Sequence, residues 1–135
     1  MPPVHHLPAG DRQALLERLS HALAERGEIV FAYVHGSILR PDGFRDIDVA
    51  VWTSETAGPR TDVELATDLS RDIGYPVDVR VVNRAPVAFL FHALRGRPLV
   101  VRDERFLADL IERTARTYHD HAPLARRATR EAFAG

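Results

Sequence analysis

Two aspartates stand one residue apart in an apolar segment, at Asp46 and Asp48, where the sequence reads Asp-Ile-Asp-Val-Ala-Val. Side chains of a β-strand alternate between its two faces, so both carboxylates are expected on one face. A third acid, Asp78, lies between two valines in a later segment. Carboxylate oxygens are hard ligands, which Mg²⁺ prefers. If the two segments form neighbouring strands, the acids predict a site for two Mg²⁺ ions about 3.5–4 Å apart, bridging a triphosphate and an attacking oxygen.

The expected roles of the three acids differ. Asp46 and Asp48 would hold both ions, whereas Asp78 would hold the ion that activates an acceptor hydroxyl and could also take its proton. The alternative for Asp78 alone is a salt-bridged acid at a sheet edge. Arg80 shares the strand face of Asp78. It either contacts phosphate, whose geometry arginine matches, or serves as a structural partner of Asp78.

A Gly-Ser pair precedes the acids, at Gly36 and Ser37, at the end of a segment rich in β-forming residues. The glycine lets the backbone come close to a phosphate group, and the serine N–H and hydroxyl offer donors at the start of a helical turn. Arg40 and Arg45 flank the following loop and could steer a nucleotide toward it, although solvated arginines are the alternative. These four residues are the expected nucleotide contacts.

The apolar periodicity around these residues predicts an α/β fold in which helices flank one small mixed β-sheet. Strands are expected over residues 28–34, 46–52, 77–82 and 98–102, and helices over residues 11–26, 61–73, 86–95 and 103–118. A short helical turn over residues 37–40 should end before Pro41, and a last short helix could begin at Pro123.

Two of the predicted helices have explicit start signals. Residues 61–64 have the pattern of a capping box, and Asp103 is a good N-cap for the helix that follows it. The inward residues expected for the first of these helices are Val63, Ala66, Leu69 and Ile73. Those expected for the second are Phe106, Leu107, Leu110, Ile111 and Ala115.

The composition is that of an ordinary globular domain, with 135 residues, 45% of them hydrophobic and 27% charged. The absence of cysteine excludes a disulfide scaffold, a thiolate nucleophile and a cysteine-based zinc site. Every one of the 18 basic residues is arginine, which excludes a catalytic lysine and a P-loop lysine. With a net charge of -1, direct binding of nucleic acid is not expected.

The length suggests one domain over residues 1–135, with residues 1–10 as an irregular lead-in and His5-His6 as a disordered start. No apolar run approaches the roughly 20 residues of a membrane span. The first residues have neither the basic region nor the apolar core of a secretion signal. A cytoplasmic protein that does not contact the membrane is therefore expected.

The order of these motifs resembles that of the minimal nucleotidyltransferases (MNT) of the DNA-polymerase-beta superfamily. The resemblance rests on Gly-Ser, a loop, the Asp-x-Asp segment of residues 44–51, the later acid in residues 76–79, and the tail of residues 113–120. One departure is Pro41, which stands where the family usually has glycine. The resemblance implies a nucleotidyltransferase fold and Mg²⁺-dependent transfer of AMP from ATP to a hydroxyl. That hydroxyl attacks the α-phosphorus, and pyrophosphate leaves.

A chain of this length is expected to lack a separate acceptor-binding domain, so a partner protein should deliver the acceptor. The resemblance implies that this partner is a HEPN ribonuclease toxin, that the acceptor is a tyrosine of the toxin, and that the chain acts as the antitoxin in a hetero-oligomer. Residues 87–91 and the C-terminal helix are the expected contact surface. Two alternatives remain: a non-catalytic module that neutralises its partner by contact, and a small-molecule nucleotidyltransferase of the aminoglycoside-modifying kind.

Overall fold

A four-stranded mixed sheet forms the centre of the computed structural model, which describes the backbone of residues 3–133 and the side chains of residues 3–120. The strands are β1 (Ile29–His35), β2 (Ile47–Thr53), β3 (Val77–Val81) and β4 (Arg97–Val101), in the spatial order β3-β2-β1-β4. β1 pairs antiparallel with β2 and β4, and β2 pairs parallel with β3. The predicted α/β class with a mixed sheet is confirmed, and each strand lies within one residue of its predicted bounds.

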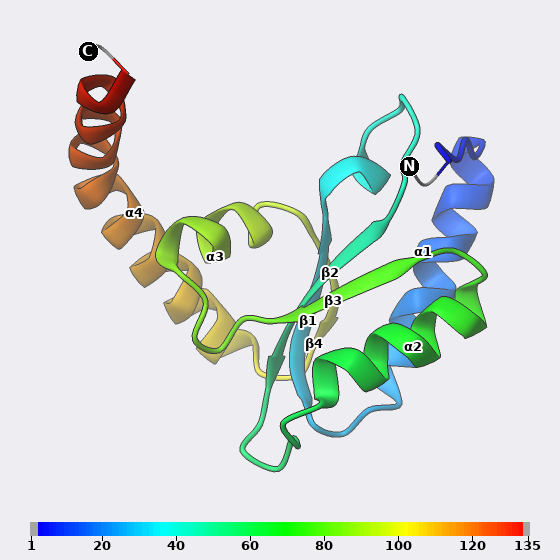
Figure 1. Cartoon of the computed structure of the whole chain (residues 1–135). Helices are drawn as coiled ribbons and strands as arrows, with labels where there is room; N and C mark the ends of the chain where they lie inside the picture. Colours follow the sequence, from blue (N-terminus) through cyan, green and yellow to red (C-terminus); the bar gives the residue numbers. More distant parts are fainter. Residues whose placement is uncertain (1–2, 134–135) are drawn as a thin grey trace.

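Helices cover both faces of this sheet (Figure 1). α1 (Ala9–Ala24) and α2 (Thr61–Ile73) lie on one side, and α3 (Val87–Ala93) and α4 (Glu104–Phe133) lie on the other. The core on the α1/α2 side includes Leu16, Leu19, Leu23, Val34, Ile47, Val49, Val51, Leu65 and Leu69. The core on the α3/α4 side includes Phe31, Tyr33, Ala50, Val82, Leu90, Leu107 and Leu110. None of the described helices is both long enough and apolar enough to cross a bilayer.

The side chains of β2 alternate between the two faces of the sheet, and this alternation explains where the acids can lie. Ile47, Val49 and Val51 belong to the α1/α2 core, whereas Ala50 belongs to the opposite one. Asp48 therefore shares the face of Ala50, because side chains two residues apart lie on the same side of a strand. The acidic side chain is thereby kept out of the larger apolar core.

The start of α2 differs from the predicted capping box. Thr61 is the first helical residue rather than the N-cap, and its hydroxyl donates to the carbonyl of Gly58 at 2.7 Å. Val63, predicted to face inward, is 57% exposed, and Leu65 is buried instead. At about 100° per residue, Val63 points roughly 200° away from Leu65 and so lies on the other side of the helix.

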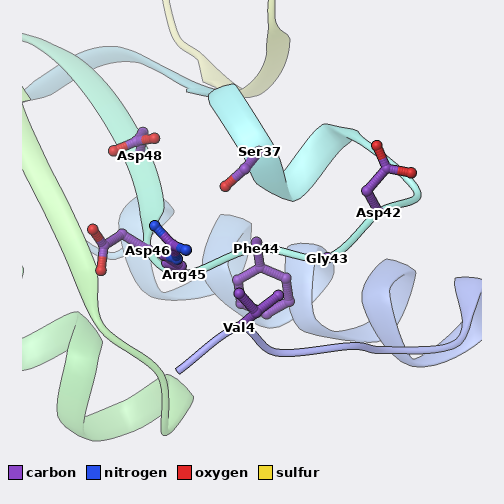
Figure 2. Close-up of a pocket in the computed structure, with 8 residues that line it drawn as sticks. All are labelled: Val4, Ser37, Asp42, Gly43, Phe44, Arg45, Asp46 and Asp48. Atoms are coloured by element: carbon purple, nitrogen blue, oxygen red, sulfur yellow. The ribbon is translucent and has the colours of Figure 1, made fainter. Parts of the chain in front are cut away.

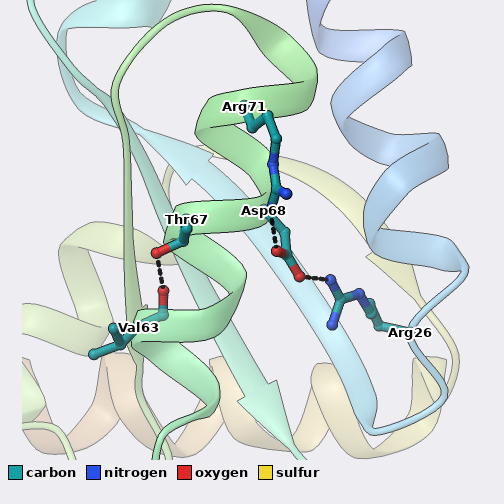
Figure 3. A network of polar contacts seen from close by, with 5 residues as sticks. All are labelled: Arg26, Val63, Thr67, Asp68 and Arg71. Atoms are coloured by element: carbon teal, nitrogen blue, oxygen red, sulfur yellow. Dashed lines mark hydrogen bonds and ion pairs between the residues drawn. The ribbon is translucent and has the colours of Figure 1, made fainter.

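An ion-pair network holds α2 against the segment that follows α1 (Figure 3). Asp68 accepts hydrogen bonds from Arg26, beyond the end of α1, and from Arg71 one turn along α2, the latter at 2.7 Å. The network lies at the surface, so it orients the two helices more than it stabilises them.

α4 begins as predicted and ends later. The Asp103 carboxylate accepts a hydrogen bond from the Phe106 N–H at 3.0 Å, which is an N-cap contact. The prediction of a break near residue 118 and a new helix at Pro123 is wrong, because one helix runs to Phe133 and extends away from the domain (Figure 1). A proline removes one backbone hydrogen bond without having to end a helix. Ile111, predicted to face inward, is exposed.

Candidate active site

The three predicted acids lie at one end of the sheet. Asp48 of β2 and Asp78 of β3 are register partners on adjacent strands, so their side chains stand next to each other on one face. Asp46 directly precedes β2. His35, the last residue of β1, is the register partner of Asp48 on its other side. A row of three ionisable residues, His35, Asp48 and Asp78, therefore crosses three neighbouring strands.

Gly36 brings the Gly-Ser turn against this row. Its φ of +82° lies in the left-handed region, and a Cβ atom at this position would lie 2.5 Å from Oδ2 of Asp48. Only glycine allows this approach without strain. Residues Gly36–Leu39 form one turn of 3₁₀-helix, as the predicted short helical turn requires, and Ser37 is half-buried beside Asp48.

A cavity of about 330 Å³ opens beside the turn and the acids. It is lined by Val4, Ser37, Asp42, Gly43, Phe44, Arg45, Asp46 and Asp48. Figure 2 shows Ser37, Asp46 and Asp48 around one part of this space, with Asp42 at the far end of the loop. Arg45, one of the predicted nucleotide contacts, lines this cavity. Arg40 is exposed and does not line the cavity.

The electrostatics of the site favour a bound cation. Burial raises the pKa of Asp48, and the charges of Asp78 and Asp46 raise it further, while His35 and Arg80 oppose the shift. Burial lowers the pKa of His35, and the charge of Arg80 lowers it further, while the charges of Asp48 and Asp78 oppose this shift. Among the described side chains, none makes a hydrogen bond or ion pair with the three carboxylates. The acids are close enough to repel one another, and their oxygens are free to bind.

These carboxylates do not form a complete metal cage by themselves. Within the described residues, no three His, Asp or Glu side chains converge closely enough to hold an ion. The donor set nevertheless fits Mg²⁺, which usually takes one or two carboxylates and completes its shell with phosphate oxygens and water. Asp46, Asp48 and Asp78 would supply the protein ligands, and a nucleotide in the adjacent cavity would supply the remainder.

The N-terminal segment is part of the site, which the sequence did not predict. His5 and Phe44 exchange two backbone hydrogen bonds, of 2.7 and 3.0 Å, and the His5 ring meets Tyr75 edge-on at 4.9 Å. The expectation that His5 belongs to a disordered start is therefore wrong. A Cβ atom on Gly43 would lie 2.8 Å from Val4, so this glycine lets the segment lie directly on the loop. We call residues 4–6 the N-terminal strap.

Arg80 does not pair with Asp78. In the part of the chain whose side chains are described, Arg80 makes no ion pair, and its guanidinium lies over the ring of Phe89 at 4.4 Å. The His35 ring meets the same phenyl ring edge-on at 5.7 Å. Phe89, on α3, thus forms a wall beside the acids. The sequence indicated neither His35 nor Phe89 as part of the site, and the position of His35 directly before the Gly-Ser turn was the one available signal.

The profile of the family described as "Polymerase beta, Nucleotidyltransferase" matches residues 17–105, a range that contains the Gly-Ser turn and all three acids. The chain therefore belongs to this family and is a nucleotidyltransferase. No curated protein sequence matches the chain significantly.

Solved structures with the same fold include three toxin–antitoxin complexes. One is a tri-AMPylated Shewanella oneidensis HEPN toxin in complex with MNT antitoxin, with a TM-score of 0.71 and 19% identity over 92% of this chain and 99% of that one. Another is the toxin–antitoxin MntA–HepT, with a TM-score of 0.69 and 19% identity over 91% and 99% of the two chains. The third is a toxin–antitoxin with AMP-PNP, with a TM-score of 0.66 and 19% identity over 95% and 100%. At this identity the likeness confirms the minimal nucleotidyltransferase fold.

Proposed function

We propose that this chain is a Mg²⁺-dependent adenylyltransferase that transfers AMP from ATP to a tyrosine of a HEPN-type toxin, and so acts as the antitoxin. The observation that carries the proposal is the close approach of Gly36 to Asp48, with Asp78 in register beside it. The proposal takes the Gly-Ser turn as the phosphate-binding turn, and it is supported by the contact of this turn with a carboxylate that makes no ion pair with any described side chain.

The cavity residues suit the triphosphate. The Ser37 N–H and hydroxyl can donate to phosphate oxygens, and the Arg45 guanidinium supplies the positive charge on the cavity wall. Two bound Mg²⁺ ions would neutralise charge that develops on the phosphoryl oxygens. In this proposal Asp46 and Asp48 would hold both ions, and Asp78 would hold the one on the acceptor side.

The reaction is an in-line displacement at the α-phosphorus. The acceptor hydroxyl loses its proton, and Asp78 is the candidate base because it is exposed, whereas Asp46 and Asp48 are half-buried. A bond forms between the acceptor oxygen and the α-phosphorus, the bond from the α-phosphorus to the α–β bridging oxygen breaks, and pyrophosphate leaves. The chain's own contribution is to position the two reactants and to stabilise charge.

The choice of partner is supported by the structures that share this fold. They are toxin–antitoxin complexes, one contains an ATP analogue, and the toxin of another carries AMP groups. A hetero-oligomer in which the toxin brings its tyrosine to Asp78 would supply the acceptor.

The test is a transfer assay with a purified HEPN-type toxin, α-labelled ATP and Mg²⁺. Wild type should label the toxin on tyrosine, and Asp46→Asn with Asp48→Asn should abolish labelling while still binding the toxin. The same double substitution should remove the rise in melting temperature that Mg²⁺ and a non-hydrolysable ATP analogue produce. Toxin neutralisation by the double variant without any labelling would instead establish inhibition by contact.

A further inference from the structure

The outer edge of β3 carries backbone groups that no other described strand pairs with. β3 is an edge strand, with β2 on its inner side. The Val82 N–H donates to the Val51 carbonyl of β2 at 2.9 Å, so the even-numbered residues of this segment direct their backbone groups toward β2. Successive residues of a strand direct these groups to opposite edges, so Val77, Val79 and Val81 direct theirs outward.

One end of this edge is capped, and the rest is open. The Ser70 hydroxyl of α2 accepts a hydrogen bond from the Val77 N–H at 2.9 Å and lies 3.4 Å from the Val77 carbonyl, to which it donates. No described residue pairs with the outward groups of Val79 or Val81. An edge with unpaired N–H and C=O groups is a template for a strand of another chain.

The side chains of β3 complement themselves in antiparallel order. The strand reads Val-Asp-Val-Arg-Val, and its charged residues, Asp78 and Arg80, are both exposed. If two copies of β3 pair antiparallel with Val79 opposite Val79, the outward backbone groups of the two valines face each other. Asp78 of each copy then lies directly opposite Arg80 of the other, where opposite charges attract. Arg80 would thereby gain an ion pair that the described side chains of its own chain do not give it.

An exposed apolar residue lies on the same side of the domain. Val63 of α2 is 57% exposed, and it lies one helical turn from Thr67 and two turns from Ser70 along one side of the helix. Ser70 contacts the edge of β3, so this side of α2 faces that edge, away from Arg26 (Figure 3). Helices pack about 8–10 Å apart, about two strand spacings of 4.7–4.9 Å, so α2 of a second copy would lie beside Val63.

We propose that this chain forms a two-fold symmetric homodimer through β3, in which the two sheets join and Arg80 of each copy pairs with Asp78 of the other. A second copy fits this edge better than an unrelated strand, because the register that pairs the free backbone groups also pairs the charges. A two-fold interface requires a patch that is complementary to itself in this way. The two α2 helices cover the exposed valine of each other.

In this dimer the second copy contributes a residue to the active site. Its Arg80 occupies the Asp78 carboxylate, the acid assigned above to the acceptor-side ion. The dimer is therefore a resting form, and an acceptor that approaches Asp78 competes with the second copy. This consequence rests on the proposed adenylyl transfer, whereas the pairing of the two strands does not.

Analytical ultracentrifugation of the full chain tests the pairing without ATP or a toxin. Wild type should be a reversible mixture of monomer and dimer between about 1 μM and 1 mM. Arg80→Asp and Asp78→Arg each make both cross-strand pairs repulsive, so either variant alone should associate about tenfold more weakly or worse. An equimolar mixture of the two variants should form heterodimers, because the acidic side chains of one then face the arginines of the other. A monomeric wild type over this range, or a mixture that associates no better than its components, would overturn the proposal.

Disulfide cross-linking tests the register. The chain has no cysteine, so Asp78→Cys and Arg80→Cys each introduce a single thiol. In the mixture of these variants the two thiols are directly opposite, within reach of a disulfide. Either variant alone should cross-link roughly tenfold more slowly, because its thiols are diagonal neighbours about 7–8 Å apart. Equal rates for the mixture and for the single variants would contradict the register.

Val63 offers a test away from the acids, with a matched control. Val63→Glu should weaken the dimer about tenfold through the loss of apolar burial in both copies. Ile111, an exposed residue of α4 on the other side of the sheet, is the control, and Ile111→Glu should leave association unchanged. Equal effects of the two substitutions would contradict the contact between the α2 helices. Circular dichroism confirms that each variant is folded.

The transfer assay tests the resting form. The rate of AMP transfer per copy of the enzyme should fall as its concentration rises through the dissociation constant of the dimer, and Val63→Glu should shift this fall to higher concentration. A rate per copy that is independent of concentration would refute the resting form. If wild type transfers no AMP at any concentration, the proposed function fails, whereas ultracentrifugation and cross-linking still decide whether β3 joins two copies.

Discussion

Gly36→Ala tests the central feature of the site, the contact between the Gly-Ser turn and Asp48. The substitution has two separate costs. At φ +82°, alanine is in the left-handed region, which costs a residue with a Cβ atom about 1–2 kcal/mol. The new methyl group would lie 2.5 Å from Oδ2 of Asp48, so the carboxylate must rotate away, at about 0.5–1.5 kcal/mol if it leaves its preferred rotamer.

Gly74→Ala separates these two costs. Gly74 ends α2 with φ +86°, and nothing lies within 4 Å of a Cβ atom built there. Gly74→Ala should therefore lose only the free energy of the left-handed backbone, about 1–2 kcal/mol, whereas Gly36→Ala should lose both contributions, about 1.5–3.5 kcal/mol. Urea denaturation of the two variants with equal m-values gives the comparison.

Activity should separate the two variants further. Displacement of a reacting or metal-binding group by about 1 Å can lower a rate roughly 100-fold, so Gly36→Ala should reduce AMP transfer on that scale, and Gly74→Ala should not. In the double variant with Asp48→Ala, the steric part of the Gly36→Ala cost should disappear, which a double-mutant cycle measures. Equal stability losses in the two glycine variants, together with undiminished transfer by Gly36→Ala, would refute the contact.

The other predictions concern the acids and the strap. Asp78→Asn should lower the rate of transfer far more than the affinity for the ATP analogue, as expected of an interaction needed chiefly in the transition state; equal losses would make it a general structural acid. His5→Ala should raise the KM for ATP more than it lowers kcat, because it removes the ring contacts with Phe44 and Tyr75 that support the loop carrying Arg45, and His5→Phe, which keeps a ring, should restore the KM; an unchanged KM would separate the strap from the cavity. Asp48→Asn should raise the melting temperature of the free protein at pH 7, because burial and neighbouring acids raise the pKa of Asp48 and its ionised form therefore opposes folding. That gain should shrink as the pH falls below the ordinary range of aspartate, where both side chains are neutral, and a gain independent of pH would point to packing.

Much of the site was predictable because its signals are local. The alternation of valines and acids in residues 46–52 and 77–82 defines two strands with their carboxylates on one face, and the Gly-Ser pair marks the turn. Asp48 can lie beside Asp78 only if their two strands are neighbours in the sheet, which the sequence does not determine. The structure shows that β2 and β3 are neighbours and pair in parallel.

The features that the sequence did not predict depend on contacts between distant residues. His5 is ordered by contacts with Phe44 and Tyr75, which lie far along the chain. The short N-terminal segment has no apolar periodicity from which these contacts could be predicted. Arg80 could pair with Asp78 by strand parity, but the helix that carries Phe89 offers its guanidinium a ring instead. The inward assignment of Val63 was wrong for a related reason: Leu65, Leu69 and Ile73, spaced by four residues, set the buried stripe and leave Val63 outside it.

The unpaired state of the acids connects stability with function. Asp48 is held beside Asp78 and Asp46 although their charges oppose its ionisation, and no described side chain forms an ion pair with it. A salt bridge here would stabilise the free protein, yet it would occupy the oxygens that Mg²⁺ needs. Because a ligand that binds only the folded state stabilises it, Mg²⁺ with a nucleotide should restore the stability that ionised Asp48 removes. If the proposed site is correct, the residue whose ionisation opposes folding of the free chain is thus also the one that couples its stability to the nucleotide.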